Sequence, residues 1–148
     1  MILMQATRRA ALRLAFATVG LASAACSANL DTSAQAGLGC VDDSKHCIEQ
    51  RRNALHSYMN DKERRWVREA PTPAAYASGV RLFAFKSRKS ELSCDELATG
   101  RREADNATAV LRGPGSSGLS PAQVSRGLML GAEVSRELGA EMKRRCRA

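Results

Sequence analysis

Apolar residues recur every three or four positions through most of the chain after residue 40, a spacing that places them on one face of an α-helix. Residues with strong start or stop preferences divide this pattern into four stretches. We expect helices over residues 44–69, 73–87, 94–111 and 121–146. The strict alternation of a half-buried β-strand does not occur over any comparable length, so the sequence predicts an all-α domain.

The boundaries of these stretches carry residues that favour helix starts and stops. Ser93 and Glu96 form a capping box, in which each side chain satisfies a backbone amide of the first turn. Ser120 followed by Pro121 starts the last stretch, because serine caps well and proline suits the first helical position. The other boundaries are marked by Asp43 or Ser44, Pro71, Thr72 with Pro73, and the glycine-rich residues 113–118.

Each predicted helix has an apolar face that we expect to be buried. These faces consist of Ile48, Leu55, Met59 and Trp66; Tyr76, Val80, Phe83 and Ala84; Leu97, Ala104 and Leu111; and Val124, Leu128, Leu138 and Met142. The fourth helix also carries small residues at four-residue spacing, Gly127, Gly131, Ser135 and Gly139. Glycine inside a helix costs about 1 kcal/mol relative to alanine, so we favour close packing of this stripe against a neighbouring helix or Trp66 over a groove for a partner.

The expected helix lengths suit a four-helix bundle. The first and fourth helices, of about 26 residues each, would both be roughly 39 Å long and would match as an antiparallel pair. The second is shorter, but the extended link after it can bring the chain back to its starting end. We therefore predict a small up-down bundle that forms a single domain over residues 40–148.

In that bundle four cysteines, Cys40, Cys47, Cys94 and Cys146, lie at one end. An even number of clustered cysteines in an exported chain indicates two disulfides. We favour Cys47 with Cys146 and Cys40 with Cys94 over the local pairing of Cys40 with Cys47 and Cys94 with Cys146. A thiol-based metal-binding or redox protein that uses the same four-cysteine cluster is the alternative, although the close Cys-x2-Cys pairs of zinc sites are missing and no metal ligand is assigned.

The first 25 residues have the pattern of an export signal peptide. Three arginines precede an apolar run over residues 14–25, which is shorter than the about 20 residues needed to cross a bilayer. Residues 23–26, Ser-Ala-Ala-Cys, resemble a bacterial lipobox, in which Cys26 would carry a lipid; simple cleavage after residue 24 or 36 is the alternative. Residues 26–39 suit a flexible tether or residual signal region. We therefore expect a bacterial periplasmic or secreted protein without a transmembrane span in its mature chain, with a lipid anchor as a further hypothesis.

The chain is basic, with a net charge of +8, and the part after residue 36 has 20 basic against 14 acidic residues. We expect seven basic residues to meet at the cysteine end: Lys86, Arg88, Lys89, Lys143, Arg144, Arg145 and Arg147. Such a patch would attract an anionic envelope surface or an acidic protein partner. Nucleic acid is disfavoured as a partner because the chain is exported and offers few aromatic rings for stacking.

Sequence motifs for catalysis or cofactor binding are missing. His46 and His56 are the only histidines, and their ten-residue separation places them nearly opposite each other on a helix. The serines of residues 113–118 lack the nucleophile-elbow pattern, and this loop lacks the lysine of a phosphate-binding loop. We therefore expect no enzymatic activity and no cofactor. The sequence favours an exported cell-envelope protein with a binding or structural role.

Overall fold

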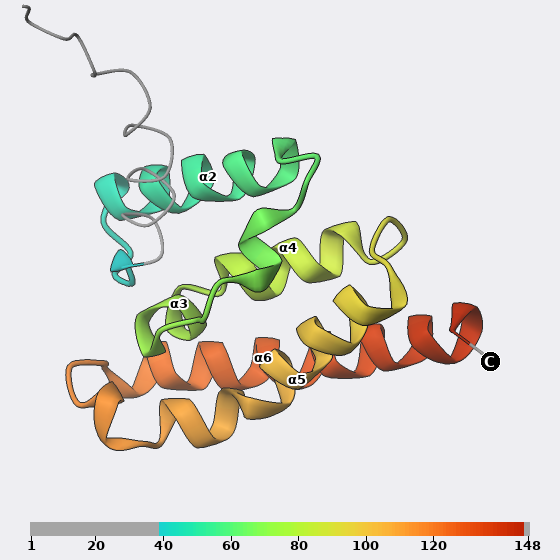
Figure 1. Ribbon diagram of the computed structural model, residues 1–148. Coiled ribbons are helices and arrows are strands. Elements are labelled where there is room, and N and C mark those ends of the chain that lie inside the picture. The colour runs from blue at the N-terminus through green and yellow to red at the C-terminus, as the bar shows by residue number, and fades with distance from the viewer. Residues whose placement is uncertain (1–38, 147–148) are drawn as a thin grey trace, which may run out of the picture.

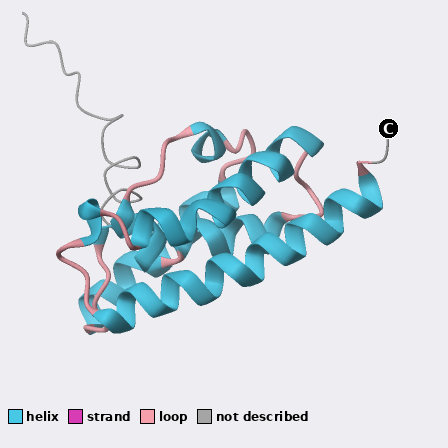
Figure 2. Cartoon of the chain, turned by 90° about the horizontal axis from the view of Figure 1, so that it is seen from below, coloured by secondary structure: helices cyan, strands magenta, loops and turns pink. Residues whose placement is uncertain are grey.

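The computed structural model describes residues 39–146, which fold into α-helices joined by short connections (Figure 1; Figure 2). The elements in this range are α2 (Lys45–Asn60), η1 (Arg65–Arg68), α3 (Pro73–Ser78), α4 (Val80–Arg88), α5 (Cys94–Leu111), η2 (Pro114–Ser116) and α6 (Pro121–Arg145), where η marks a short 3-10 helix. Residues 39–146 contain no β-strand, which confirms the all-α class. The expected signal peptide, the tether before residue 39, the lipidation candidate Cys26 and Arg147 lie outside the described residues.

The first predicted helix, 44–69, ends early, at Asn60. Asp61 has an extended backbone, and its carboxylate accepts hydrogen bonds from the amides of Glu63 at 3.1 Å and Arg65 at 2.8 Å. An aspartate that binds nearby amides in this way competes with the helical hydrogen bonds. Arg64 then adopts a left-handed backbone with φ 51°, which rules out continuation of the helix.

The second predicted helix, 73–87, consists of two helices, α3 and α4, joined at Gly79. Gly79 has φ +74°, a left-handed conformation that glycine adopts without the steric cost of a side chain. A Cβ at this position would also lie 2.7 Å from Leu130 Cδ2 on α6. The apolar spacing continues through the glycine, so the pattern alone does not reveal the break.

Helices α5 and α6 lie close to the predicted boundaries. At the start of α5, Ser93 and Glu96 form both hydrogen bonds of the predicted capping box. Ser120 and Gln123 form the same pair of hydrogen bonds at the start of α6. These two helices therefore begin where their local capping signals place them.

The small residues of α6 face α5 at close range. A Cβ at Gly127 would lie 2.6 Å from Leu111 Cδ1, and one at Gly131 would lie 2.7 Å from Ala107 Cβ. Ala107 Cβ cannot rotate away from a side chain at Gly131, and a Cβ at Gly127 would also lie 3.0 Å from the backbone oxygen of Tyr76, so a side chain at either position would force the packing to shift. The prediction that the stripe packs against a neighbouring helix is confirmed, and that neighbour is α5.

The up-down order is wrong, because α2, α4 and α6 run in one direction and α5 runs back (Figure 1). Arg88 at the end of α4 donates a 3.1 Å hydrogen bond to the carbonyl of Tyr58 near the end of α2. At the opposite end, Asp43 just before α2 pairs at 2.9 Å with Arg126 in the first turns of α6. The physical reason lies in residues 61–72, which return the chain to its starting end without a long helix and so make α2 and α4 parallel.

The buried face of α2 is offset from the predicted one. Cys47, Ala54 and Tyr58 are buried, whereas Ile48 and Met59 are 41% and 38% exposed. Because α2 packs mainly against α4 at the side of the domain, only a narrow face of this helix is covered. The heptad pattern therefore predicts a helix here, but it places the buried face of α2 wrongly.

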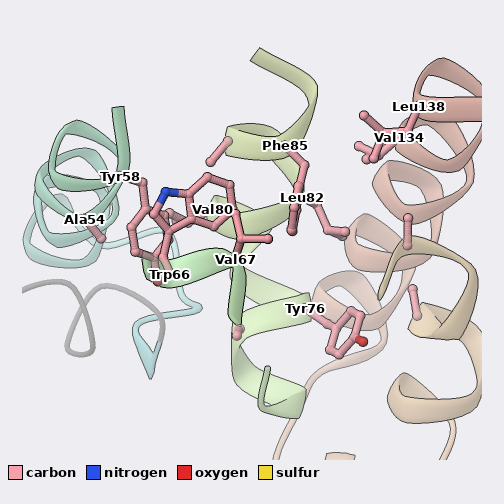
Figure 3. Close-up of a cluster of buried hydrophobic side chains, with 14 of the residues drawn as sticks. Ala54, Tyr58, Trp66, Val67, Tyr76, Val80, Leu82, Phe85, Val134 and Leu138 are labelled. Carbon is pink, nitrogen blue, oxygen red and sulfur yellow. The ribbon is translucent and has the colours of Figure 1, made fainter. Parts of the chain in front are cut away.

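Most of the other predicted core residues are buried. Those that are fully buried are Trp66, Tyr76, Val80, Ala84, Leu97, Ala104, Leu111 and Leu138, while Leu55, Val124, Leu128 and Met142 are partly buried. Phe83 is the exception, with 45% of its surface exposed. Figure 3 shows the aromatic part of this core, in which the Trp66 ring lies between α2 and α4. Its centroid is 5.0 Å from that of Tyr58 and 4.7 Å from that of Phe85.

A buried ion pair crosses this core. Arg81 on α4 is 1% exposed and donates hydrogen bonds of 2.9 and 2.8 Å to both carboxylate oxygens of Glu103 on α5. Its remaining donors reach the carbonyl oxygens of Trp66 at 2.6 Å and Glu69 at 2.9 Å. Arg81 therefore ties the returning segment 61–72 to α4 and α5, although it is not among the predicted core or site residues.

Candidate anion-binding groove beside the second disulfide

The four cysteines form two disulfides, Cys40–Cys47 and Cys94–Cys146, with Cα–Cα distances of 5.1 and 5.7 Å. The expected number of bridges is confirmed, but the favoured pairing is wrong and the local alternative is observed. The first bridge joins Cys40, which precedes α2, to Cys47 in the first turn of that helix. The second joins the start of α5 to the residue after α6.

The expectation that the two bridges share one end of the domain is also wrong. Asp43, beside the first bridge, pairs with Arg126 in the first turns of α6. Cys146 lies 20 residues further along that helix, which corresponds to roughly 30 Å. Since α2 and α6 are parallel, the bridges lie toward opposite ends, and the four cysteines do not form one cluster. Residues 39–146 contain no group of three or more histidine, cysteine, aspartate or glutamate side chains placed to hold a metal ion.

The predicted basic residues of α4 come close to the end of α6, but glutamates of α6 lie between them. Lys86 pairs with Glu133 at 2.6 Å and with Glu137 at 3.3 Å, and Lys89 also donates to Glu137. The hydrogen bond from Lys89 and that from Lys86 hold the pKa of Glu137 below its ordinary value despite partial burial. The hydrogen bond to Glu133 correspondingly raises the pKa of Lys86. These two lysines are therefore bound to carboxylates of the domain itself.

The arginines of the predicted patch divide between buried and surface roles. Arg88 is buried and donates to the carbonyls of Tyr58 and Asp61 and to the carboxylate of Glu91. Arg144 and Arg145 pair with Glu141 at 2.5 and 3.2 Å. The hydrogen bond from Arg144 lowers the pKa of Glu141.

Arg145 has a second role at the end of α6. Its guanidinium donates hydrogen bonds to the carbonyl oxygens of Lys89, Ser90 and Leu92 at 3.1, 2.8 and 3.0 Å. These bonds hold the end of α6 against the turn between α4 and α5. They act at the same place as the Cys94–Cys146 bridge but through different atoms.

A shallow groove of about 350 Å³ lies at this end, between α5 and α6. It is lined by Arg101, Gly139, Met142, Lys143 and Cys146. Met142 and the sulfur-containing Cys146 give it an apolar part, and Arg101 and Lys143 give it two exposed cations. A small anion with an apolar portion matches this combination of charge and surface.

Packing between the two helices places Arg101 over the groove. A Cβ at Gly139 would lie 3.4 Å from Arg101 Cζ, so the guanidinium extends across α6 to within contact distance of this position. Asp105, one turn further along α5, lies 3.7 Å from Arg101 and accepts a hydrogen bond from Ser135. Both charged side chains of this pair are about half exposed, which leaves the contact weak.

Arg101 was absent from the predicted patch, whereas Lys143 was included. A sequence signal for Arg101 was available, because it follows Cys94 by seven residues and a helix places two such residues on the same side. The predicted patch instead contains the cations that an up-down bundle would bring together at the cysteine end. Of the six predicted patch residues that the structure describes, Lys143 alone lines the groove.

The remaining candidate residues lie elsewhere and have ordinary partners. His46 and His56 are exposed on α2, where they form hydrogen bonds with Gln50 and Asn60, each one turn further along the helix. Ser116 Oγ donates to the carbonyl of Gly113 within the turn before α6. The described helices bring neither histidine to a serine in a catalytic arrangement.

Comparison with protein-family models, curated proteins and solved structures gives no match to this chain. Among residues 39–146, the helices are too short or too polar to cross a bilayer. The disulfides, the charges and the groove are therefore the features of this chain that bear on its function.

Proposed function

We propose that this chain is an exported, non-enzymatic protein of a bacterial cell envelope, periplasmic or secreted, with a binding or structural role. The observation that carries the proposal is the pairing of all four cysteines between residues 40 and 146 into disulfides. Structural disulfides persist in oxidising compartments and are rare in the cytosol. The export pattern of residues 1–25 supports the same compartment.

The proposed partner is an anionic envelope surface or an acidic protein. Support comes from the basic balance of the chain and from two exposed cations around the Cys94–Cys146 end, Arg101 and Lys143, whereas Arg144 at the same end is paired with Glu141. Lys86 and Lys89 contribute less to this attraction because glutamates of α6 neutralise them. Attraction between exposed charges weakens as salt rises, so binding should be salt-dependent.

A lipid at Cys26 is the proposed means of attachment. Pairing of the other four cysteines leaves Cys26 as the one cysteine of the five without a disulfide partner among them. A lipid on this residue would hold the domain near a membrane through residues 27–39. Stable attachment by acyl chains uses more than one chain, or one chain with a basic patch.

Localisation of the full chain in a bacterium tests export and anchoring together. We expect the wild type to lose its signal segment, to resist alkylation at its four paired cysteines and to fractionate with membranes. The Cys26→Ser variant should be exported but recovered in the soluble fraction. Recovery of uncleaved chain with reduced cysteines in the cytosol would contradict the proposal.

Vesicle binding by residues 27–148, which lack the lipidation candidate, tests the partner class. We expect binding to vesicles that contain anionic lipid at low salt, and reduced binding at 0.5 M salt. The Arg101→Gln/Lys143→Gln variant should bind more weakly, whereas Arg136→Gln, which alters an exposed α6 arginine outside the groove, serves as the single-charge control. Equal affinity for neutral and anionic vesicles would remove the anionic partner.

A further inference from the structure

The two disulfides differ in their access to solvent. In the first bridge Cys47 is 3% exposed and Cys40 is partly exposed. Cys94 is exposed and Cys146 is partly exposed. Thiol–disulfide exchange requires a thiolate to reach a sulfur atom, and the second bridge offers more of that access because Cys94 is exposed where Cys47 is buried.

The groove places a cationic site next to the accessible bridge. Cys146 is part of its lining, together with Arg101 from α5 and Lys143 from the preceding turn of α6. Two cations beside a disulfide raise the local concentration of an anionic reagent, by tenfold or more in favourable cases. The surrounding charge thus favours an anionic thiol over a neutral or cationic one.

We propose that Cys94–Cys146 is an exchange site for an anionic low-molecular-weight thiol, which binds in the groove between Arg101 and Lys143. This inference rests on the anion-binding role proposed above and names the ligand class for the groove. The ligand carries one or more carboxylates that the cations bind, and a thiol that reaches Cys146.

The chemistry is a balanced exchange at sulfur. The thiolate of the ligand attacks Cys146 Sγ, a new sulfur–sulfur bond forms, and the Cys94–Cys146 bond breaks. Its electron pair leaves with Cys94 Sγ, which then takes a proton from water or attacks the mixed disulfide to restore the bridge. A second ligand thiol can release Cys146, so that two thiols are oxidised to one disulfide and the protein bridge is reduced.

The start of α5 gives the departing Cys94 thiolate a mixed environment. Cys94 is the first residue of this 18-residue helix, where backbone amides favour a negative charge. Asp95 and Glu96 in the same turn oppose that effect, although Glu96 is paired with Arg64 at 2.9 Å. Access and the cationic groove, rather than the helix end, therefore carry the proposal.

The domain can keep its fold after this bridge opens. Arg145 continues to bind the carbonyls of the turn between α4 and α5. The close packing at Gly127 and Gly131 continues to hold α6 against α5. Exchange at Cys94–Cys146 is thus compatible with a folded protein, and circular dichroism can verify this during the reaction.

The test compares both bridges within one molecule. Mature protein is treated at low salt and neutral pH with glutathione, 2-mercaptoethanol or cysteamine, which are anionic, neutral and cationic thiols respectively. Alkylation at timed intervals followed by mass spectrometry of tryptic peptides reports each cysteine separately. Because each thiol reacts with both bridges in the same molecule, the ratio of the two reduction rates does not depend on the intrinsic reactivity of that thiol.

We expect Cys94–Cys146 to open at least about tenfold faster than Cys40–Cys47 with glutathione, and this ratio to fall from glutathione to cysteamine. The Arg101→Gln/Lys143→Gln variant should lose most of the preference for glutathione, while Arg136→Gln should keep it. Asp105→Asn should increase the preference, because it removes the carboxylate that competes for Arg101. Equal opening of the two bridges, or a preference unchanged in the double variant, would overturn the proposal.

Vesicle binding separates a failure of this inference from a failure of the proposed function. Salt-sensitive vesicle binding without a thiol preference would overturn exchange in the groove and leave the anionic partner standing. A thiol preference without vesicle binding would support exchange and restrict the groove to small anions.

Discussion

The α5–α6 pair and the α2–η1 region show two different ways in which this chain is held together. Helices α5 and α6 are antiparallel neighbours in sequence, with close backbone contacts at Gly127 and Gly131 and a disulfide across one end. The α2–η1 region instead meets α4 through long-range hydrogen bonds from Arg81 and Arg88 to backbone carbonyls. The comparison indicates that glycine packing fixes one half of the domain and buried arginine fixes the other.

Loss of Arg81 should produce the largest effect on the α2–η1 region. Arg81→Met would leave Glu103, which is 7% exposed, without its bidentate partner, and should lower the free energy of unfolding by about 3–5 kcal/mol in urea titrations. The Arg81→Met/Glu103→Leu variant should recover part of this loss because it removes both charges. Arg65→Met, at an arginine that is 69% exposed, is the surface control, and an equal loss there would contradict a special role for Arg81.

The second largest difference between the two regions should appear in the free energy of unfolding when each disulfide is removed. The Cys94–Cys146 bridge closes a loop with a sequence separation of 52, and the Cys40–Cys47 bridge closes one with a separation of 7. Replacing either pair by serine opens the corresponding loop. Loop-closure entropy predicts losses of about 4 and about 2.5 kcal/mol in the free energy of unfolding. Urea titrations of the two double-serine variants measure the difference, and a larger loss for the shorter loop would argue against the account.

Glycine substitutions should test the packing of α5 against α6. At Gly131 an added Cβ would lie 2.7 Å from Ala107 Cβ and 3.1 Å from the carbonyl of Ala104. Gly131→Ala should therefore destabilise the protein by about 1–3 kcal/mol through overpacking. Gly139→Ala meets its nearest neighbour at 3.4 Å and should be neutral or stabilising by up to about 1 kcal/mol through helix propensity. Thermal unfolding of both variants checks this order.

The smallest expected effect concerns the link between α4 and α6. The hydrogen bonds from Lys89 and Lys86 lower the pKa of Glu137 in the folded protein from its ordinary value of 4.5. The stability from this carboxylate is therefore present above pH 4.5 and is lost as the pH falls through the lowered pKa. Glu137→Gln should flatten this acid limb of the stability curve, with a change below about 1 kcal/mol because the site is partly exposed.

Unfolding of Glu137→Gln at several pH values between 3 and 7 measures that effect. Glu63→Gln alters a glutamate whose side chain is 80% exposed and provides the control. Identical pH dependence for the wild type and Glu137→Gln would contradict the proposed coupling.

The sequence predicts the α5–α6 pair well because its signals are local. The capping boxes at Ser93 and Ser120 depend on residues three positions apart, and the glycine spacing reports a close helix neighbour. The early end of α2 at Asn60 and the parallel order follow from Asp61 and from carbonyl contacts of Arg81 and Arg88, which join residues distant in sequence. The wrong disulfide pairing is a consequence of the wrong helix direction.

The candidate site is predicted only in part for a related reason. Lys143 is in the predicted basic patch, but Arg101 enters the groove across Gly139 of the neighbouring helix. The glutamates that neutralise Lys86 and Lys89 likewise come from α6. Charge counting along the sequence does not reveal which cations already have carboxylate partners.

Disulfide mapping of the mature protein tests the central claim most directly. Trypsin cleaves after Lys45, Arg51, Lys89, Arg101 and Arg145, so each of the four paired cysteines falls on a separate peptide. Digestion without reductant, after alkylation of any thiols, should yield one linked pair containing Cys40 and Cys47 and another containing Cys94 and Cys146. A peptide that joins either of the first two cysteines to either of the last two would contradict the parallel arrangement of α2 and α6 and the site built on it.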